Sequence, residues 1–408
     1  WKTRSIQDRD LFLATRRLGP ELAQGRHRAI SLYQAGRTDD ALAAFAKVIR
    51  TARNNGQPEL AGELAFTRGS IMVRAGRHLP ASESFLAVAN QQPAHPRAAS
   101  AHLLWAWCLG QIDRKQSNAA RRQAYHEALV QHRTRFPKDP TTAEATWLLA
   151  ALEHDQQHVE RARTLWLAIP AEHPRAAAGR RLVGESFEKE LAGMAQEDSA
   201  RIRRLESAIQ AVEGLVARLP GPPRTWSTDQ AGLGISLARL SLKRPRPNYR
   251  RVDELLEMVL TRGPTVAGKS PDPKAVVLRD TARQLRVLSL AGQGRLDDAR
   301  GLIATFSRRP GDLLALLDGL DRVAVTTRPT DRRRLGELQL QAAQTLDSQR
   351  NSLDQDDTRR LDRCLAQAYV AAGFPLRAVS LYQQLVKSTP RDWRLRSRLA
   401  EIRVATGS

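Results

Sequence analysis

The sequence predicts an all-α fold, built as an α-solenoid of helix-turn-helix repeats. Apolar residues recur at three- and four-residue spacing almost throughout, which places them on one helix face. Strong helix formers such as Ala, Leu, Arg, Gln and Glu dominate the 408 residues, and apolar residues make up 41%. Gly, Pro or Asx residues interrupt the pattern at the intervals expected of turns between helices. No run is long and apolar enough for a membrane-spanning helix.

The expected helices repeat along the chain. At four places a turn glycine lies five residues before an alanine, and a large apolar residue lies four residues after that alanine. These triplets are Gly36, Ala41 and Phe45; Gly76, Ala81 and Phe85; Gly294, Ala299 and Ile303; and Gly373, Ala378 and Tyr382. Two of the turns are nearly identical, Gly-Arg-Thr-Asp-Asp-Ala at 36–41 and Gly-Arg-Leu-Asp-Asp-Ala at 294–299, which indicates internal duplication.

This pattern resembles the tetratricopeptide repeat, in which helix A, a tight turn and helix B form a unit of 34 residues. The segment around Ala162 and Trp166 keeps the register without the glycine, and the segment with Val252 and Leu256 keeps it more loosely. The resemblance is strong in 22–55, 62–95, 280–313 and 359–392, good in 143–176, and weaker in 97–137, 178–220 and 227–264.

Prolines divide the array. They cluster at 220–223, 245–247 and 264–273, and none of these stretches can be a helix interior because proline lacks a backbone donor. We expect the first break to separate an N-terminal arm, 1–220, from a C-terminal arm, 221–408. All nine histidines lie in the first arm, between His27 and His173. Residues 311–348 are expected to form irregular helices, and 391–405 a closing helix.

One string, from Gly263 to Ser270, matches the phosphate-loop pattern Gly-x4-Gly-Lys-Ser. A phosphate loop follows a buried strand and opens a helix, but residues 252–262 have helical spacing and Pro271 comes directly after the serine. We therefore expect a solvated loop here, and neither a nucleotide nor another cofactor.

Other candidate sites have simpler interpretations. His154 and His158 could hold a metal on one helical face, but the repeat register places them in the turn between two helices. Cys108 and Cys364 are predicted to be small buried side chains. We expect no metal site and no catalytic residues, and hence no enzyme.

The charge is strongly basic. Lys and Arg number 65 against 43 Asp and Glu, a formal net charge of +22, and arginines cluster at 201–204, 332–334, 359–363 and 391–398. Such clusters could bind nucleic acid by releasing counterions. Aromatic residues are only 5% of the chain, which leaves few rings for base stacking. We expect an acidic protein partner first and nucleic acid second.

The resemblance to tetratricopeptide proteins implies a right-handed α-solenoid in which helix A of each unit lines a concave groove. Residues at positions two, five, nine and twelve of helix A would then face a partner. The groove is expected to be basic and apolar, which suits an extended or helical partner segment with acidic and hydrophobic side chains. The partner-binding residues implied by this register are Arg26, Tyr33, Phe66, Val73, Trp147, Gln284, Leu288, Arg360 and Arg363.

The leading hypothesis is therefore a non-enzymatic scaffold for protein–protein interaction. The alternatives are a nucleic-acid-binding helical repeat and an accessory region of a larger enzyme or envelope complex. His-Pro-Arg-Ala-Ala at 95–99 and 173–177, with Arg-Phe-Pro-Lys-Asp-Pro-Thr-Thr-Ala-Glu-Ala at 135–145, resembles bacterial cell-envelope repeat proteins. Because the chain begins at Trp1, we expect a fragment or a processed product, and the cytoplasm and the cell envelope both stay open as locations.

Overall fold

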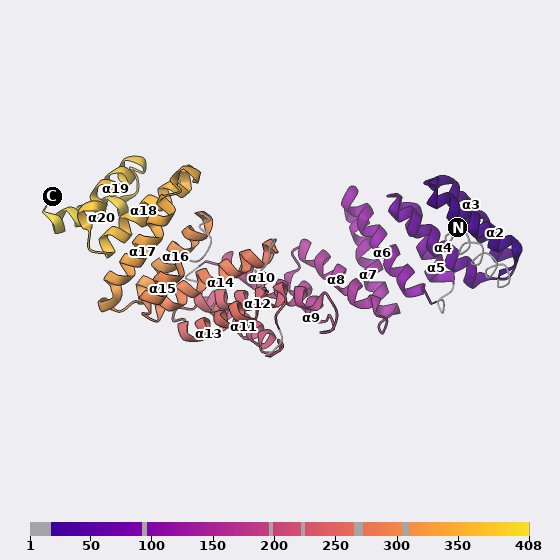
Figure 1. Cartoon of the computed structure of the whole chain (residues 1–408), viewed down its shortest axis with the longest axis horizontal. Helices are drawn as coiled ribbons and strands as arrows, with labels where there is room; N and C mark the ends of the chain where they lie inside the picture. The colour runs from indigo at the N-terminus through magenta and orange to yellow at the C-terminus, as the bar shows by residue number, and fades with distance from the viewer. Residues whose placement is uncertain are drawn as a thin grey trace, which may run out of the picture. The chain divides into compact units, whose positions relative to one another are not determined.

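The computed structural model describes residues 18–91, 96–195, 199–221, 225–264, 272–303 and 310–407. Within these ranges every regular element is a helix, which confirms the all-α prediction (Figure 1). Packing divides the chain into two compact units, residues 1–176 (unit 1) and 177–408 (unit 2). The division expected at residue 220 stays a prediction.

The helices have these bounds. Unit 1 contains α2 (Pro20–Gln34), α3 (Thr38–Asn54), α4 (Pro58–Arg74), α5 (His78–Gln91), α6 (Ala98–Lys115), α7 (Ala119–Arg135), α8 (Thr141–Asp155) and α9 (Val159–Leu167). Unit 2 contains α10 (Ala176–Ala192, from its second residue), α11 (Ser199–Val216), α12 (Thr228–Leu242), α13 (Tyr249–Arg262), α14 (Pro273–Gly292), α15 (Leu296–Ile303), α16 (Pro310–Thr326), α17 (Arg332–Asp347), α18 (Gln355–Ala371), α19 (Pro375–Ser388) and α20 (Trp393–Thr406).

Within each unit the helices form consecutive pairs, and the even-numbered helix opens each pair. We call the even-numbered helices A-type and the odd-numbered ones B-type. Neighbouring A-type helices also touch, α6 with α8 in unit 1, and α12 with α14, α14 with α16 and α16 with α18 in unit 2. This is the stacking of an α-solenoid. The segment 311–348, expected to be irregular, is a regular pair formed by α16 and α17 with one 3-10 turn between them.

The turns between the two helices of a pair are built alike in five repeats. The glycines at four of them have positive φ, 76° at Gly36, 72° at Gly76, 78° at Gly294 and 87° at Gly373. In each turn the amide after the glycine donates to the carbonyl five residues earlier, as Arg37 does to Leu32 at 3.0 Å. This bond satisfies a carbonyl that the end of the helix leaves without a partner.

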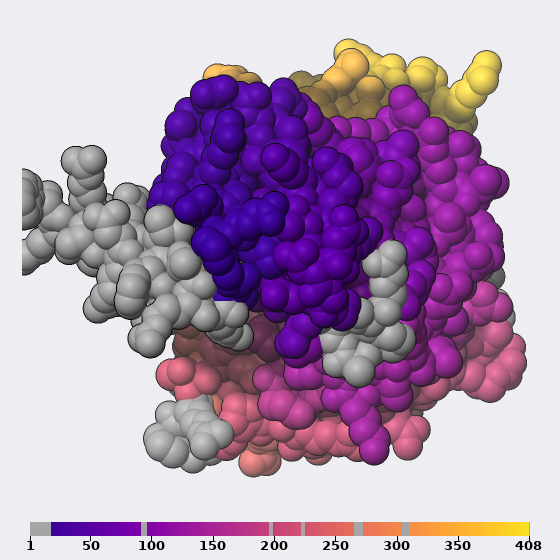
Figure 2. All heavy atoms as spheres, turned by 90° about the vertical axis from the view of Figure 1, so that its right-hand side faces the viewer, coloured from indigo at the N-terminus to yellow at the C-terminus, as the bar shows by residue number. Residues whose placement is uncertain are grey.

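The predicted alanines lie at the helix–helix joints. Their side chains are 0% exposed, and the large apolar residues four positions later are 0–4% exposed. The alanines with this burial are Ala41, Ala81, Ala162, Ala299 and Ala378. In the space-filling view the first repeats, in indigo, form a continuous packed surface (Figure 2).

Prolines lie outside the helix interiors, as predicted. Pro245 and Pro247 lie in the connection between α12 and α13, and Pro273 is the first residue of α14, where its missing N–H has no helical partner. The closing helix α20 begins at Trp393 and is bounded by Asp392, whose carboxylate accepts from Arg394 N at 3.0 Å. Within the described ranges, no helix combines the length and apolar character that crossing a membrane requires.

We predict that Ala378→Leu destabilises unit 2. The leucine would overpack the joint between α18 and α19, which costs about 1–3 kcal/mol. Urea unfolding followed by circular dichroism measures the change. An unchanged midpoint would mean that Ala378 does not lie at the joint.

The fifth turn contains a strained residue. Gln157 occupies the glycine position of the α8–α9 turn, with a φ of 64°. We predict that Gln157→Gly stabilises unit 1, because a non-glycine residue in this region costs about 1–2 kcal/mol. The greater freedom of glycine in the unfolded chain offsets about 0.4–1 kcal/mol of that gain.

The neighbouring residue supplies the control. Gln156 has a φ of −83°, so Gln156→Gly relieves no strain and is expected to destabilise the unit. Urea midpoints of the two variants should move in opposite directions. Equal destabilisation by both would contradict the strain at Gln157.

Candidate functional site

The residue at position five of the repeat window contacts the start of the next A-type helix in four repeats. Gln284 of α14 donates its side-chain amide to Asp312 O of α16 at 2.7 Å. Arg363 of α18 pairs with Asp392 before α20 at 3.3 Å. Phe66 of α4 and Trp147 of α8 make the corresponding contacts with arginines. Position five therefore joins successive repeats, in addition to any contact that it makes with a partner.

The first aromatic contact lies in unit 1 between α4 and α6. Arg97, the residue before α6, places its guanidinium carbon 4.8 Å from the centre of the Phe66 ring. The same arginine donates to Glu63 at 2.8 Å. On its inner side the Phe66 ring meets Phe85 edge to face, with the ring centres 5.4 Å apart. Phe66 is thus half-buried and contributes to the core as well as to the surface.

The second aromatic contact repeats the first with different residues. Arg175, directly before α10, lies 5.2 Å from the Trp147 ring and pairs with Glu144 at 3.1 Å. Glu144 precedes Trp147 by three residues, as Glu63 precedes Phe66. An arginine that is fixed by a carboxylate and stacked on a ring therefore occurs twice in unit 1.

The sequence analysis missed these two arginines as site residues, although a signal for them was present. Arg97 and Arg175 are the arginines of the two His-Pro-Arg-Ala-Ala segments. About half of each arginine side chain is exposed, 47% and 48%. The stacked guanidiniums thus have surface on which a carboxylate could bind.

The other predicted groove residues of unit 1 lie on the expected helices. Arg26 is exposed on α2, and Tyr33 and Val73 are half-buried against the core. The Tyr33 hydroxyl accepts from Arg74 Nη1 at 3.5 Å. With Phe66 and Trp147 they make a mixed basic and apolar set on α2, α4 and α8.

Two of the predictions in unit 2 need correction. Gln284 is 9% exposed and its amide is used within the fold, while Leu288 is 5% exposed. Both point into the stack of A-type helices because α14 contacts both α12 and α16. Arg360 and Arg363 are exposed but paired, with Asp318 and Asp392.

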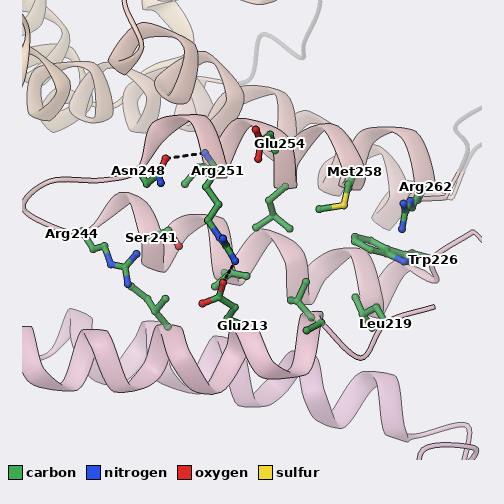
Figure 3. Close-up of a pocket in the computed structure, with 16 residues that line it drawn as sticks. Glu213, Leu219, Trp226, Ser241, Arg244, Asn248, Arg251, Glu254, Met258 and Arg262 are labelled. Carbon is green, nitrogen blue, oxygen red and sulfur yellow. Dashed lines mark hydrogen bonds and ion pairs between the residues drawn. The ribbon is translucent and has the colours of Figure 1, made fainter. Parts of the chain in front are cut away.

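Unit 2 also contains a cleft that the sequence did not predict (Figure 3). It has a volume of about 370 Å³ and lies between the B-type helices α11 and α13, with α12 behind them. This is within the range of small-ligand pockets. The cleft lies where two of the three weakest repeat windows, 178–220 and 227–264, meet. Its apolar lining comprises Ile209, Val216, Ala217, Leu219, Trp226, Leu237, Val252, Leu255 and Met258.

Charged residues bound the cleft. Arg251 of α13 pairs with Glu213 of α11 across it. Towards the other end, the Arg262 guanidinium lies 5.7 Å from the ring of Trp226, which is 4% exposed. The arrangement can accept an elongated apolar group between the two guanidiniums.

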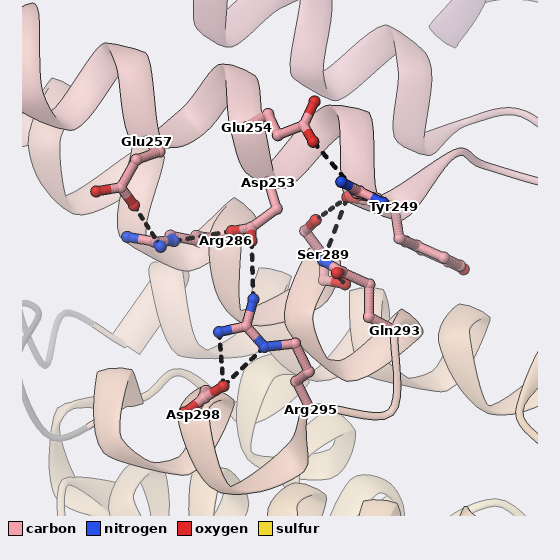
Figure 4. A network of polar contacts seen from close by, with 10 residues as sticks. Tyr249, Asp253, Glu254, Glu257, Arg286, Ser289, Gln293, Arg295 and Asp298 are labelled. Carbon is pink, nitrogen blue, oxygen red and sulfur yellow. Dashed lines mark hydrogen bonds and ion pairs between the residues drawn. The ribbon is translucent and has the colours of Figure 1, made fainter.

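A polar network holds α13, α14 and α15 together beside this cleft (Figure 4). Asp253, only 8% exposed, accepts from Arg286 at 2.8 Å and from Arg295 at 3.3 Å. Arg295 also pairs with Asp298 at 2.7 Å. A buried carboxylate is tolerated when it is paired in this way, so we interpret the network as structural.

Catalytic and metal-binding chemistry has little support among the described residues. Burial raises the pKa of Cys108 to about 12 and that of Cys364 to about 11, which leaves both thiols protonated and unreactive. His158 bonds to Glu153 at 2.7 Å. No cluster of three or more metal-ligating side chains occurs in the described part of the chain.

Most of the phosphate-loop string lies outside the described residues. Its first residue, Gly263, ends α13 and donates its amide to Val259 O at 2.9 Å. The string is thus preceded by a helix, as the spacing predicted. The expectation that it is inert stays a prediction.

Two buried histidines make unit 1 sensitive to acid. Burial lowers the pKa of His102 and of His132 to about 4, and their rings lie 5.4 Å apart. Unfolded histidine titrates near about 6.5, so between these values the unfolded chain binds more protons than the folded chain. In the folded unit both histidines stay neutral until the pH falls to about 4, so acidification through this window lowers the free energy of unfolding.

We predict that the urea midpoint of the chain, followed by tryptophan fluorescence, falls as the pH is lowered from 6.5 to 4. His102→Leu removes one of the two titrating groups, so this variant should show a shallower fall than the wild type. An unchanged slope would mean that His102 is not the group responsible.

Comparisons with known proteins were made on both sequence and structure. No protein-family model matches the sequence, and no curated protein matches it significantly. A tetratricopeptide repeat protein from Parabacteroides merdae is similar in structure, with 12% identity, a TM-score of 0.35, and coverage of 84% of this chain and 98% of that chain. The C-terminal part of a tetratricopeptide repeat-containing protein from Cytophaga hutchinsonii has 13% identity, a TM-score of 0.38, and coverage of 82% and 99%.

A structure of Naa15/Naa10 bound to HypK-THB gives 13% identity and a TM-score of 0.37. It is matched over 95% of this chain, which spans 61% of the length of that chain. Because all these TM-scores are below 0.5, the description of the repeat rests on the turns and joints of this chain and not on the structural matches. These turns and joints define an α-solenoid of stacked helix pairs, and they resemble those of the tetratricopeptide repeat.

Proposed function

We propose that the chain is a non-enzymatic scaffold that binds a partner segment on the A-type helices of unit 1. The observation that carries this proposal is the repeated arrangement of glutamate, arginine and aromatic ring on α4 and α8. Arg97 and Arg175 are held in place before a partner arrives, so binding them costs less side-chain entropy than binding free arginines would.

The chemistry of this surface favours a segment with both acidic and hydrophobic side chains. The guanidiniums of Arg97 and Arg175 offer charge-assisted hydrogen bonds to carboxylates. Tyr33, Phe66 and Val73 are half-buried and leave apolar surface between them. Aromatic and arginine side chains are the usual anchors of such interfaces.

A peptide selection tests the proposal. A random peptide library selected on the full chain should yield sequences rich in Asp, Glu and large apolar residues. The best peptide should bind Arg97→Met/Arg175→Met at least about tenfold more weakly, because each charge-assisted hydrogen bond contributes about 1.5–3 kcal/mol. Methionine keeps an apolar stem over each ring, and circular dichroism checks the fold.

Arg50→Met/Arg161→Met is the matched control. These exposed arginines lie on the B-type helices α3 and α9, so their loss should leave peptide affinity unchanged. Equal losses in the two double variants would indicate general attraction to a basic protein. No loss in either would move binding away from unit 1.

Nucleic acid remains the second candidate because of the net charge of +22. Many arginines of the clusters are, however, paired within the fold, including Arg204 with Glu190 and Arg334 with Asp297. Affinity for heterologous RNA that falls steeply with salt, and that exceeds affinity for every selected peptide, would favour this second candidate.

A further inference from the structure

The last helix, α20, is apolar on two opposite faces. Its inner face carries Leu395, Leu399 and Ile402, which are 4–9% exposed and pack with α19 in one cluster. The opposite face of α20, which we call its outer face, also carries apolar side chains, and these are exposed.

The outer face presents an apolar stripe. Trp393, Ala400 and Val404 are spaced by seven and four residues, which places them on one side of a helix. Trp393 is 66% exposed and Val404 is 84% exposed. From Trp393 to Val404 the stripe extends over three turns, about 16 Å at the helical rise.

The stripe is flanked by cations. Four exposed arginines of this segment make no ion pair with the described residues: Arg391, Arg394, Arg396 and Arg403. The Arg394 guanidinium lies 5.8 Å from the Trp393 ring. Arg398, by contrast, pairs with Glu401 at 2.7 Å. The surface therefore combines an apolar centre with a rim of uncompensated positive charge.

We propose that the outer face of α20 is a docking surface for an acidic amphipathic helix of a partner protein. The apolar side of such a helix would cover Trp393, Ala400 and Val404, as the next helix of a solenoid would. Its flanking carboxylates would pair with Arg394, Arg396 and Arg403. This surface lies in unit 2 and is independent of the binding proposed for unit 1.

The composition of the surface argues against the other ligands that a basic surface attracts, which are anionic membranes and nucleic acids. A membrane-bound helix needs a broad apolar face, whereas this stripe has three apolar residues. A phosphate backbone would match the arginines but leave Ala400 and Val404 without apolar contact. A helix with carboxylates beside an apolar stripe satisfies both parts of the surface.

The test uses the full chain and a labelled synthetic peptide of eighteen residues. The peptide carries leucines at heptad spacing, flanked by glutamates, and a second peptide has lysine in place of every glutamate. Fluorescence anisotropy should show saturable binding of the acidic peptide alone. Trp393→Ser/Val404→Ser and, separately, Arg396→Gln/Arg403→Gln should each weaken it at least tenfold.

The control variants are Val325→Ser and Arg246→Gln, which change an exposed apolar residue and an exposed arginine elsewhere in unit 2. They should bind the acidic peptide as the wild type does. Circular dichroism verifies that all variants are folded. Equal binding of the lysine peptide, or no effect of either α20 double variant, would overturn the proposal.

Three further measurements distinguish other occupants. Phosphatidylserine vesicles or a heterologous RNA that bound α20 in preference to the acidic peptide would identify a membrane or a nucleic acid. Sedimentation that showed a dimer abolished by Trp393→Ser would identify a second copy of this chain. Each of these results would contradict the acidic helix as the occupant.

Discussion

The repeated turn between the A-type and B-type helices is the feature on which the rest of the structure depends. A residue with positive φ reverses the chain, and the following amide returns to a carbonyl five residues earlier. The turn thereby places an alanine at the point where two helices approach most closely. The alanine lies five positions after the turn residue, and this offset sets which side of the B-type helix is buried. A shift of one residue would rotate that side by about 100°.

The turn also determines which side chains of the A-type helices stay accessible to a partner. The inner side of each A-type helix packs against the B-type helix of its pair. Position five of the repeat window therefore lies beside the start of the next A-type helix. In two repeats of unit 1 this position is aromatic, Phe66 or Trp147, and is covered by Arg97 or Arg175. In unit 2 it is Gln284 or Arg363, which bonds to a neighbouring acid or carbonyl. The same position in the repeat thus belongs to the proposed binding surface in unit 1 and to a structural link in unit 2.

Much of the fold could be predicted from the sequence because turns and joints depend on residues close together in the chain. Gly36, Ala41 and Phe45 lie within ten residues, and each was placed correctly. The contact of Arg97 with Glu63 joins residues 34 apart, and its geometry depends on how two repeats stack. The cleft between α11 and α13 was missed for the same reason. Burial of Gln284 depends on α12 and α16 together, which the register of one repeat does not reveal.

Residue-resolved amide hydrogen exchange tests the repeated turn most directly. In the five turns that join an A-type to a B-type helix, the amides that return to a carbonyl five residues earlier belong to Arg37, Arg77, His158, Arg295 and Phe374. If the turns are formed as described, all five exchange slowly, although each lies at the end of a helix where unbonded amides would exchange freely. Fast exchange at these five positions, in a chain whose helix interiors are protected, would contradict the register from which the joints and the proposed surfaces follow.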